Sequence, residues 1–404
     1  MRILHVCDSI NPAGIGGYES YLHYLSLEFR KREHDTEIVT QASSRSLPLS
    51  EPQGPSEIHH LRGNLLEARK WEFLAHPAEK RDSLVDEYFN QNDLEENIEK
   101  LAAELWQLID KKQPHLIHCH STYVVFNHVL TQIAAQYGND LPPVILTVHG
   151  LPKPLILPSG EETTDYEMLF RALPFDLILA VSDTVKTALK KQARKRGAIL
   201  PIKRQYLGIN LDVFNPQKTE EKWDLAYMGR LEDMKSVHLF PDVLSKLKAI
   251  RGVLRFVMTG EGSQKQFLFD EFKKRKLGNT VDHLGIIPAK EIPNILNLSR
   301  VFLYPSKREP FGLSIVEAMA CKTPVVTSNR YGPREIITAG VDGIMVDSAD
   351  TDAIVRAVNL LLEDAELREK IGQCARNTVE KRFDIQHHVD SLLETYHSVL
   401  RSAE

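Results

Sequence analysis

The sequence predicts an α/β fold of two domains, each a doubly wound parallel sheet, with a cleft between the facing sheets. Short β-branched runs that end in polar or glycine residues alternate with longer helical stretches, which is the pattern of βαβ units. This pattern begins anew in the second half, after a stretch over residues 206–218 that contains Gly, Asn and Pro. The length of 404 residues fits two domains of ordinary size, about 100–200 residues each. Each half is therefore predicted to be a Rossmann-like domain.

Residues 1–210 supply the elements of the predicted N-terminal domain. Strands are expected over residues 2–7, 37–40, 116–118, 144–148 and 177–181. Helices are expected over residues 19–30, 127–137 and 184–194. A charged, helix-favouring insertion at about 64–112 interrupts this domain.

Residues 211–384 repeat the alternation and form the predicted C-terminal domain. Its strands are expected over residues 224–228, 254–258, 281–284, 301–304, 324–327 and 343–346. Its helices are expected over residues 237–250, 264–276, 292–297, 314–320 and 352–364. The segment 385–404 contains an amphipathic helix, which we expect to pack back toward the N-terminal domain.

Composition and charge argue against several classes of protein. The formal net charge of -5 shows no global basic excess, so nucleic acid is not an expected partner. The four cysteines are far apart, which argues against a disulfide framework or a structural zinc site and fits a reducing compartment. No run approaches the ~18 apolar residues of a membrane span, and the amino terminus is typical of a first strand rather than of a signal peptide. We therefore expect a cytoplasmic protein.

The segment 304–320 carries the sharpest functional signal. Two glutamates, Glu309 and Glu317, stand eight residues apart, with a strand before them and a Pro-Phe-Gly turn between them. Gly312 lets the backbone approach a ligand, and the helix that begins near Leu313 directs free N–H groups at an anion. Glu317 can accept two hydrogen bonds from a ribose diol. The alternative interpretation is a favourable charge at a helix start and a solvated helix residue.

This string, Glu309-Pro-Phe-Gly-Leu followed by Glu317-Ala-Met-Ala, resembles the signature of the retaining, nucleotide-sugar-dependent glycosyltransferases with two Rossmann domains, family 4 of the GT-B type. Further segments resemble this family in the expected order, namely residues 14–19, 224–231, 259–262, 283–285 and 331–335. The resemblance covers nearly the whole chain and is weakest over residues 42–112. It implies a GT-B fold.

The resemblance implies that the second domain binds a nucleoside-diphosphate sugar. Arg230 and Lys235 would hold the diphosphate, where fixed cations stabilise the charge that develops on the leaving group; two ordinary surface cations are the alternative. Glu309 would bind hydroxyls of the transferred sugar. Ser236 departs from the glycine that follows this lysine in many relatives, but it leaves both charges in place. The implied donor-binding residues are Gly16, Gly17, Gly260, Gly285, Ile286, Ile287, Phe311, Gly312, Leu313 and Glu317.

The resemblance also implies that the first domain, with its insertion, binds the acceptor. His149 follows an apolar strand, and in the family a histidine here lies near the reacting centre; the alternative is a loop histidine bonded to backbone. We count it as catalytic with Arg230, Lys235 and Glu309. The residues His118, Cys119 and His120 alternate along a strand and point to opposite sides, so no metal site is expected. The implied acceptor-binding residues are Gly16, Tyr18, His120 and His149.

The sequence is therefore identified as a retaining glycosyltransferase that moves a sugar to an acceptor hydroxyl, with a UDP-sugar as the favoured donor by association with relatives. The resemblance implies front-face attack, with no cofactor and no catalytic metal. A hydrolase or epimerase of the same fold and a non-catalytic nucleotide-sugar-binding homologue are the alternatives. An NAD-dependent dehydrogenase ranks last, because the loop over residues 14–17 lacks the complete GxGxxG. The acceptor and the oligomeric state stay open.

The segment 185–196 is strongly basic, with six Lys or Arg residues around a few apolar ones. A basic helix can dock on anionic lipid, so this segment predicts a peripheral membrane contact. A solvated helix face is the alternative and is slightly favoured.

Overall fold

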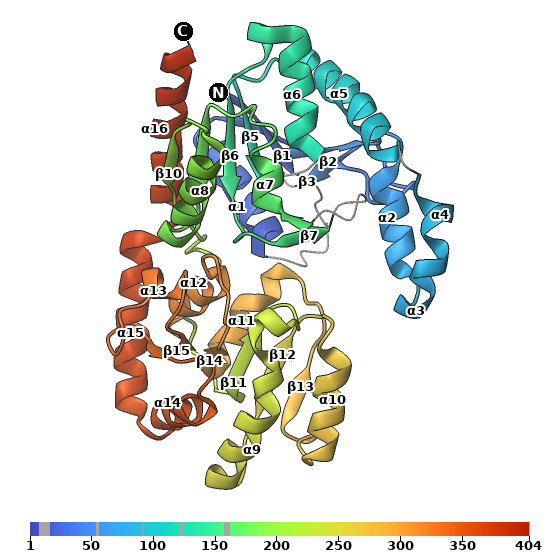
Figure 1. Cartoon of the computed structure of the whole chain (residues 1–404). Helices are drawn as coiled ribbons and strands as arrows, with labels where there is room; N and C mark the ends of the chain where they lie inside the picture. Colours follow the sequence, from blue (N-terminus) through green and yellow to red (C-terminus); the bar gives the residue numbers. More distant parts are fainter. Residues whose placement is uncertain (8–16, 54–55, 91, 121–124, 157–161, 404) are drawn as a thin grey trace.

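A computed structural model gives the structure of the chain and describes residues 1–7, 17–53, 56–90, 92–120, 125–156 and 162–403. Two layered α/β domains lie one above the other, each built on a mainly parallel sheet with helices against it (Figure 1). The predicted fold class is confirmed. The first half of the chain forms the upper domain, and the second half forms the lower one, except for a last helix that returns to the upper domain.

Within the described ranges, the N-terminal sheet has eight strands. Their bounds are β1 Arg2–Cys7, β2 Asp35–Gln41, β3 Ser50–Gln53, β4 Ser56–Leu61, β5 Leu116–His120, β6 Val144–Val148, β9 Leu177–Ala180 and β10 Ile202–Arg204. The order is β10-β9-β6-β5-β1-β2-β4-β3, and all pairs are parallel except β3 with β4. The direction of winding reverses between β1 and β5, where ligands of such sheets bind at the carboxyl ends. A separate antiparallel pair consists of β7 Pro154–Ile156 and β8 Glu162–Thr164.

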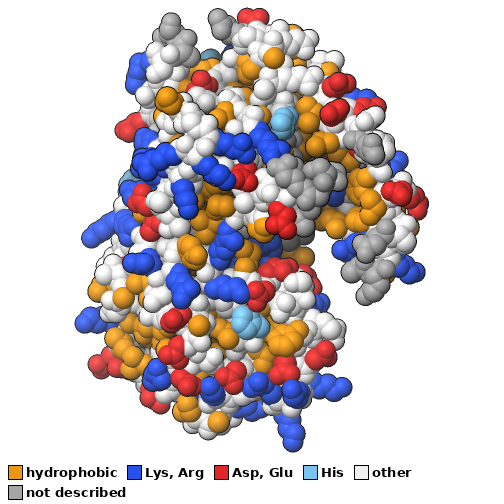
Figure 2. Space-filling model, in the orientation of Figure 1, with side chains coloured by type: hydrophobic (Ala, Val, Ile, Leu, Met, Phe, Trp, Pro, Cys, Tyr) orange, Lys and Arg blue, Asp and Glu red, His pale blue; other side chains and the backbone are white. Residues whose placement is uncertain are grey.

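The helices of the N-terminal domain are α1 Gly17–Lys31, α2 Leu66–Ala75, α3 Ala78–Arg81, α4 Val85–Tyr88, α5 Asp93–Lys112, α6 Val125–Tyr137, α7 Asp165–Leu169 and α8 Asp183–Arg196. The residues expected as an insertion, 64–112, include α5, which is the crossover between β4 and β5. Its Leu101, Leu105 and Ile109 recur at helical spacing and are buried. Helices α2–α4 project from the edge of the sheet (Figure 1), and the surface is hollowed between them and the lower domain (Figure 2).

The C-terminal sheet has six strands, all parallel, in the order β13-β12-β11-β14-β15-β16. Their bounds are β11 Trp223–Met228, β12 Phe256–Thr259, β13 Val281–His283, β14 Ser299–Tyr304, β15 Val325–Ser328 and β16 Ile344–Val346. The helices are α9 Phe240–Arg251, α10 Lys265–Lys274, α11 Ile292–Asn297, α12 Leu313–Ala320, α13 Pro333–Ile336 and α14 Thr351–Glu363. The winding reverses between β11 and β14.

Two long helices end the described chain. Helix α15, Ala365–Arg382, was not predicted; it packs so closely that a Cβ on Gly372 would lie 2.3 Å from the carbonyl oxygen of Lys322. Helix α16, Ile385–Ala403, crosses to the upper domain and packs against α1 (Figure 1). At the crossing, the amide of Ile385 donates to the carbonyl of Ile209 at 2.9 Å.

No helix in the described ranges is long and apolar enough to span a lipid bilayer. The basic helix α8 buries Val185, Leu189 and Ala193 against its domain. Lys195 at its end pairs with Glu167 at 2.5 Å. Lys and Arg side chains gather over this part of the surface (Figure 2). Contact of this surface with anionic lipid stays a prediction.

Candidate active site

The carboxyl ends of the neighbouring strands β11 and β14 bring two distant chain segments together. Arg230 follows β11, and a 3-10 turn over Asp233–Lys235 comes next. Tyr304 ends β14, and Glu309 follows in the loop that leads to α12. Because the winding reverses here, the loops leave opposite faces of the sheet and open a crevice.

Lys235, Glu309 and Tyr304 form a buried, hydrogen-bonded group. Nζ of Lys235 lies 2.5 Å from Oε2 of Glu309 and 2.9 Å from Oη of Tyr304. Tyr304 Oη donates to the same Glu309 oxygen at 2.9 Å. Burial and the negative charge of Glu309 raise the pKa of Tyr304 well above its usual range, so its hydroxyl stays a neutral donor. The structure thus pairs two predicted catalytic residues with each other, and a tyrosine that the sequence analysis gave no role joins them.

Arg230 stands beside this group with an exposed side chain. Its guanidinium lies 3.9 Å from Sδ of Met234. Its carbonyl accepts a hydrogen bond from Tyr227 Oη at 2.8 Å, which fixes the backbone at this point. The backbone of Arg230 is therefore tied into the fold, while its charged end faces solvent.

Two helices begin close to each other next to the buried group. Helix α12 starts after Gly312, whose φ of 114° lies in the left-handed region. A Cβ on Gly312 would lie 2.9 Å from Cδ1 of Ile315 and 3.5 Å from Cγ of Glu309. Across the domain boundary, a Cβ on Gly17, the first residue of α1, would lie 3.1 Å from Cδ2 of Leu313. The first N–H groups of both helices lack partners within them, so the two ends favour an anion.

Glu317 lies in α12 and is only 5% exposed. Burial raises the pKa of its carboxyl to about 7. Its charge also raises the pKa of Tyr24 on α1, behind the effect of burial, which places Glu317 at the face toward the N-terminal domain. Hydrogen-bond donors from a ligand would favour the charged form of this carboxyl and lower its pKa.

The predicted donor residues Gly260 and Gly285 lie at the ends of β12 and β13. The amide of Gly260 donates to the carbonyl of Gly285 at 2.7 Å. A Cβ on Gly260, whose φ is 105°, would lie 2.1 Å from the carbonyl oxygen of Gly229. Three strand ends therefore pack backbone to backbone, which requires glycine at 260. Ile286 beside them is 43% exposed, and Ile287 is partly buried against the core.

The side chain of Phe311 packs inward, and its donor-binding role stays a prediction. It is 3% exposed, and its ring lies 5.9 Å from that of Tyr206 and 5.8 Å from that of Phe383. A Cβ on Gly332 would approach the Phe311 carbonyl oxygen to 2.3 Å. This packing anchors the Glu309 loop against the segment that joins the domains.

Histidines gather at the facing edge of the N-terminal sheet. His120 is 1% exposed; its Nδ1 lies 3.3 Å from Nε2 of His149, and its Nε2 lies 3.1 Å from Nδ1 of His5. His120 therefore lies behind the half-buried His149, and its contact with the acceptor stays a prediction. Two further predicted binding residues lie outside what the structure describes, namely Gly16 and the side chain of Tyr18.

His5, His118 and His120 each offer a ring nitrogen, and these atoms lie within 4.8 Å of one another, so they could hold a metal ion. Both nitrogens of His118 are already bonded, Nδ1 to Tyr396 Oη at 2.6 Å and Nε2 to Thr147 Oγ1 at 2.7 Å. Burial lowers the pKa of His5 to about 3. The donor set therefore fits a network of neutral rings better than a cation site.

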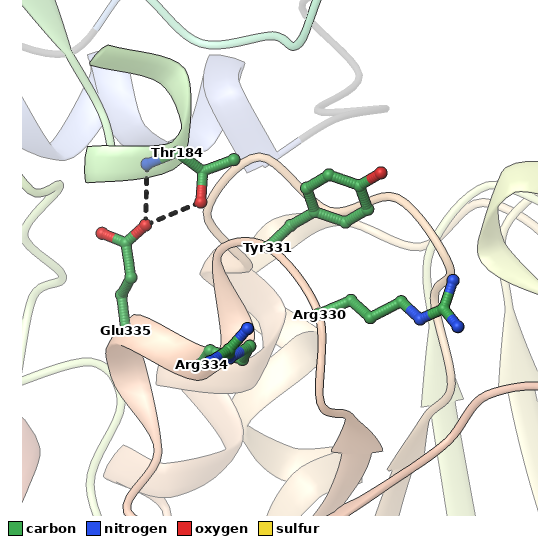
Figure 3. A pocket seen from close by; sticks show the side chains of 5 residues that line it. All are labelled: Thr184, Arg330, Tyr331, Arg334 and Glu335. Atoms are coloured by element: carbon green, nitrogen blue, oxygen red, sulfur yellow. Dashed lines mark hydrogen bonds between the residues drawn. The ribbon is translucent and has the colours of Figure 1, made fainter. Parts of the chain in front are cut away.

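An open pocket of about 470 Å³ lies where the two domains meet, lined by Thr184, Arg330, Tyr331, Arg334 and Glu335 (Figure 3). Glu335 accepts hydrogen bonds from the amide and the hydroxyl of Thr184, both at 2.9 Å, and from the amide of Asp183 at 2.7 Å. Its charge thus caps α8, which leaves the two guanidinium groups as the remaining charges of the lining. The sequence analysis singled out residues 331–335 but assigned no role to these arginines.

Comparison with known proteins adds family and fold. The family described as Glycosyltransferase Family 4 matches residues 15–212, and the one described as Glycosyl transferases group 1 matches residues 209–378. The chain is 23% identical to glycogen synthase of Mycobacterium tuberculosis, covering 98% of this chain and 94% of that protein. It is 25% identical to D-inositol 3-phosphate glycosyltransferase of Paenarthrobacter aurescens, covering 94% and 92%.

Two solved structures share the arrangement of both domains. Sucrose-phosphate synthase from Thermosynechococcus elongatus superposes with a TM-score of 0.78 at 18% identity, over 100% of each chain. HepE from Anabaena, in complex with UDP and glucose, superposes with a TM-score of 0.71 at 19% identity, over 98% of this chain and 100% of that one. The boundary between the two matched families falls between β10 and β11, where the chain passes from one sheet to the other. The chain therefore belongs to the GT-B glycosyltransferases of family 4.

Proposed function

We propose that this glycosyltransferase is a retaining enzyme that transfers a hexose from a UDP-sugar to an acceptor hydroxyl. The observation that carries the proposal is the buried Lys235–Glu309 pair with Tyr304, set beside the start of α12 and the exposed Arg230. This arrangement combines cations, free amides and a hydroxyl-binding carboxylate at one crevice. The UDP and glucose in the HepE complex support the choice of donor.

The donor would bind by replacing hydrogen bonds within the group of Lys235, Glu309 and Tyr304. Its diphosphate would contact Arg230, Lys235 and the first amides of α12, because all three supply positive charge or N–H donors. Glu309, released in part from Lys235, would accept hydrogen bonds from hydroxyls of the sugar. Glu317 would hold the ribose diol.

Transfer would follow front-face attack. The acceptor oxygen bonds to the anomeric carbon as the bond from that carbon to the phosphate oxygen breaks, and the acceptor proton moves to this phosphate oxygen. Fixed cations stabilise the charge that grows on the leaving group, so the proposal requires no catalytic metal. Closure of the two domains would exclude water from the crevice.

The acceptor would approach from the N-terminal side, past His149. The pocket lined by Arg330 and Arg334 lies beside the Glu309 loop, because the amide of Gly332 donates to the carbonyl of Glu309 at 2.9 Å. Its side chains would select among acceptors. Arg330 and Arg334 line this pocket and favour an acceptor with a phosphate or carboxylate group. The relative named D-inositol 3-phosphate glycosyltransferase supports an anionic acceptor.

A ligand screen and a product assay test the proposal. UDP should raise the melting temperature more than GDP, ADP or dTDP, because a ligand that binds the folded state stabilises it by mass action. Lys235→Ala and Glu317→Ala should lose sugar transfer, whereas Lys246→Ala, at an exposed pair on α9, should keep it. The anomeric configuration of the product, read by NMR, should match that of the donor.

The outcomes separate the alternatives. Turnover of the donor without any acceptor would indicate a hydrolase or epimerase. Donor binding without transfer to any acceptor would indicate a non-catalytic homologue. Unchanged transfer in both site variants would remove the assignment of these residues.

A further inference from the structure

His149, His120 and His5 form a line of three imidazole rings that leads from the facing edge of the N-terminal sheet into its core. His149 follows β6, His120 ends β5, and His5 lies in β1, where it is fully buried. Successive rings approach within 3.3 Å and 3.1 Å, nitrogen to nitrogen. We propose that His5 and His120 are positioning residues that fix His149 as a hydrogen-bond donor, with its proton on Nδ1. This rests on the proposed function only in placing His149 near the reacting groups.

Burial lowers the pKa of each ring in the line and favours its neutral form. Two of the groups next to the rings are uncharged aromatic side chains: Tyr21 lies edge-on to His149 at 5.8 Å, and Phe29 lies 5.9 Å from His5. The neighbouring histidines His118 and His388 also have pKa values lowered by burial. A neutral imidazole carries one N–H donor and one lone pair. The protons of the line must therefore run in one of two directions.

The inner end of the line decides the direction. Nε2 of His5 is buried and has no hydrogen-bond partner among the described residues. One direction leaves a lone pair there, and the other leaves an N–H group. A buried N–H without a partner is the rarer and costlier case, because it forfeits a full hydrogen bond to water. His5 therefore keeps its proton on Nδ1, and Nε2 carries the lone pair.

The rest of the line follows from this choice. Nδ1–H of His5 donates to Nε2 of His120, so the proton of His120 lies on Nδ1. That N–H donates to Nε2 of His149, so the proton of His149 also lies on Nδ1. The conclusion concerns the direction of the bond that His149 makes at Nδ1 and holds for any partner of that atom.

A second set of bonds keeps the rings in place. His118, held by Tyr396 and Thr147, lies beside His120 with ring centroids 4.1 Å apart and ring planes tilted by 36°. Tyr21 Oη lies 2.7 Å from Nε2 of His388, which fixes the tyrosine ring against His149. Rotation of one ring would break contacts with several others, so the line is preorganised.

The chemical consequence is that His149 has no lone pair to offer. Its Nε2 accepts from His120, and its Nδ1 carries a proton. His149 therefore cannot act as a general base for the acceptor hydroxyl; it can donate a hydrogen bond to a ligand oxygen. The acceptor proton must then go elsewhere, which fits its transfer to the leaving phosphate oxygen.

The direct test is the tautomer of each ring. Protein labelled with ¹⁵N-histidine gives long-range ¹H–¹⁵N correlations that distinguish a protonated ring nitrogen from one with a lone pair, and single substitutions assign the rings. We expect protonated Nδ1 in His5, His120 and His149, with and without UDP. A proton on Nε2 of His149 would overturn the proposal.

A variant series tests the relay itself. His5→Leu removes the first donor, so His149 should lose its single tautomer, and kcat/KM should fall about tenfold, the value of one hydrogen bond. His5→Asn keeps an N–H near the place of Nδ1 and should restore both. His118→Asn is the matched control, because it removes a buried histidine outside the line and should leave the His149 tautomer unchanged. A tautomer shift in His118→Asn equal to that in His5→Leu would contradict the relay.

The two proposals fail separately. If the tautomers are as expected and no acceptor is glycosylated, the proposed function is wrong and the proposed proton positions stand. If transfer occurs and His149 is protonated on Nε2, only the relay falls. Should His5→Leu not fold, as its melting curve would show, the tautomers of the native protein still decide.

Discussion

The two facing edges of the molecule use opposite kinds of polar chemistry. The N-terminal edge carries histidines whose pKa values are lowered by burial, to about 3 for His149 and about 4 for His388. The C-terminal edge carries the buried ion pair of Lys235 and Glu309, and a carboxyl, Glu317, with its pKa raised to about 7. The N-terminal edge thus presents neutral hydrogen-bonding groups, whereas the C-terminal edge presents charged groups. This division suits a reaction in which negative charge leaves on one side and a neutral hydroxyl arrives on the other.

The largest effect expected from this contrast is a loss of stability of the N-terminal domain in acid. A histidine with a lowered folded-state pKa contributes stability above its unfolded pKa of about 6.5, and this stability is lost as the pH falls. At pH 5 the loss is about 2 kcal/mol for each of His5, His149 and His388. Urea unfolding at pH 8 and pH 5 would measure it.

Two tryptophans report the domains separately. Trp106 stacks on Tyr137 in the N-terminal domain, and Trp223 lies in β11 of the C-terminal one. Variants that keep only one of the three tryptophans, Trp106 or Trp223, should show an acid loss at Trp106 that greatly exceeds the loss at Trp223. Equal losses of unfolding free energy at both tryptophans would contradict the predicted difference between the two domains.

The second effect concerns the buried ion pair. Lys235→Met should lower kcat by about 10³ and the free energy of unfolding by about 3–5 kcal/mol, because it removes a fixed cation and strands the Glu309 carboxylate. The double variant Lys235→Met with Glu309→Gln should regain most of the stability but none of the activity. Enzyme assays and urea unfolding would measure both.

Lys307→Met is the matched control, since Lys307 pairs with Asp233 at 2.5 Å on the surface, where the side chains are 43% and 62% exposed. It should cost less than about 1 kcal/mol. A loss of stability in this control as large as that of Lys235→Met would contradict a special role for burial.

The third effect concerns the titration of the buried carboxyl of Glu317 in the C-terminal domain. Glu317 has a raised folded-state pKa, so its neutral form stabilises the fold at low pH, and this advantage disappears as the pH rises from about 4.5 through 7. Glu317→Gln stays neutral, so its stability relative to the native protein should rise by about 3 kcal/mol between pH 4.5 and pH 8. Denaturation of the two proteins in parallel would check this. A constant difference across that range would mean that the carboxyl titrates normally.

The smallest effect concerns the pocket between the edges. Arg334→Ala should raise the KM for an anionic acceptor about tenfold and leave the KM for the donor unchanged, since one charged hydrogen bond is lost. Arg356→Ala, at a side chain 70% exposed on α14, is the control. An equal change in both KM values would place Arg334 with the donor instead.

The framework of the fold could be predicted from the sequence, because buried parallel strands read as apolar runs between helical patterns. The short strands β3 and β4 lacked such runs, and α15 lacked an apolar stripe that stood out, since small residues such as Gly372 and Ala375 form its buried face. Their places depend on tertiary packing rather than on local pattern.

The site was predictable to the level of residue types. The motif that ends in Glu317 and the basic residues after β11 converge as two loops of one sheet edge. The bond between Lys235 and Glu309 was not predictable, because 74 residues separate them and only the adjacency of β11 and β14 joins them. The line from His149 to His5 was hidden for the same reason: His5 lies opposite His118 only through the register of β1 with β5. The inward packing of the Phe311 side chain was not predictable, because its motif gives no sign of the direction of that side chain.

Helix α16 has a consequence for the order in which the protein matures. Tyr396 and His388 are made after the whole lower domain, yet they complete the bonds of His118 and Tyr21 in the upper one. During synthesis these two sites in the upper domain stay unfilled until α16 has left the ribosome. A nascent chain stopped before α16 would therefore have both sheets but would lack the partners of His118 and Tyr21, so the histidine cluster is complete only after α16 has been made.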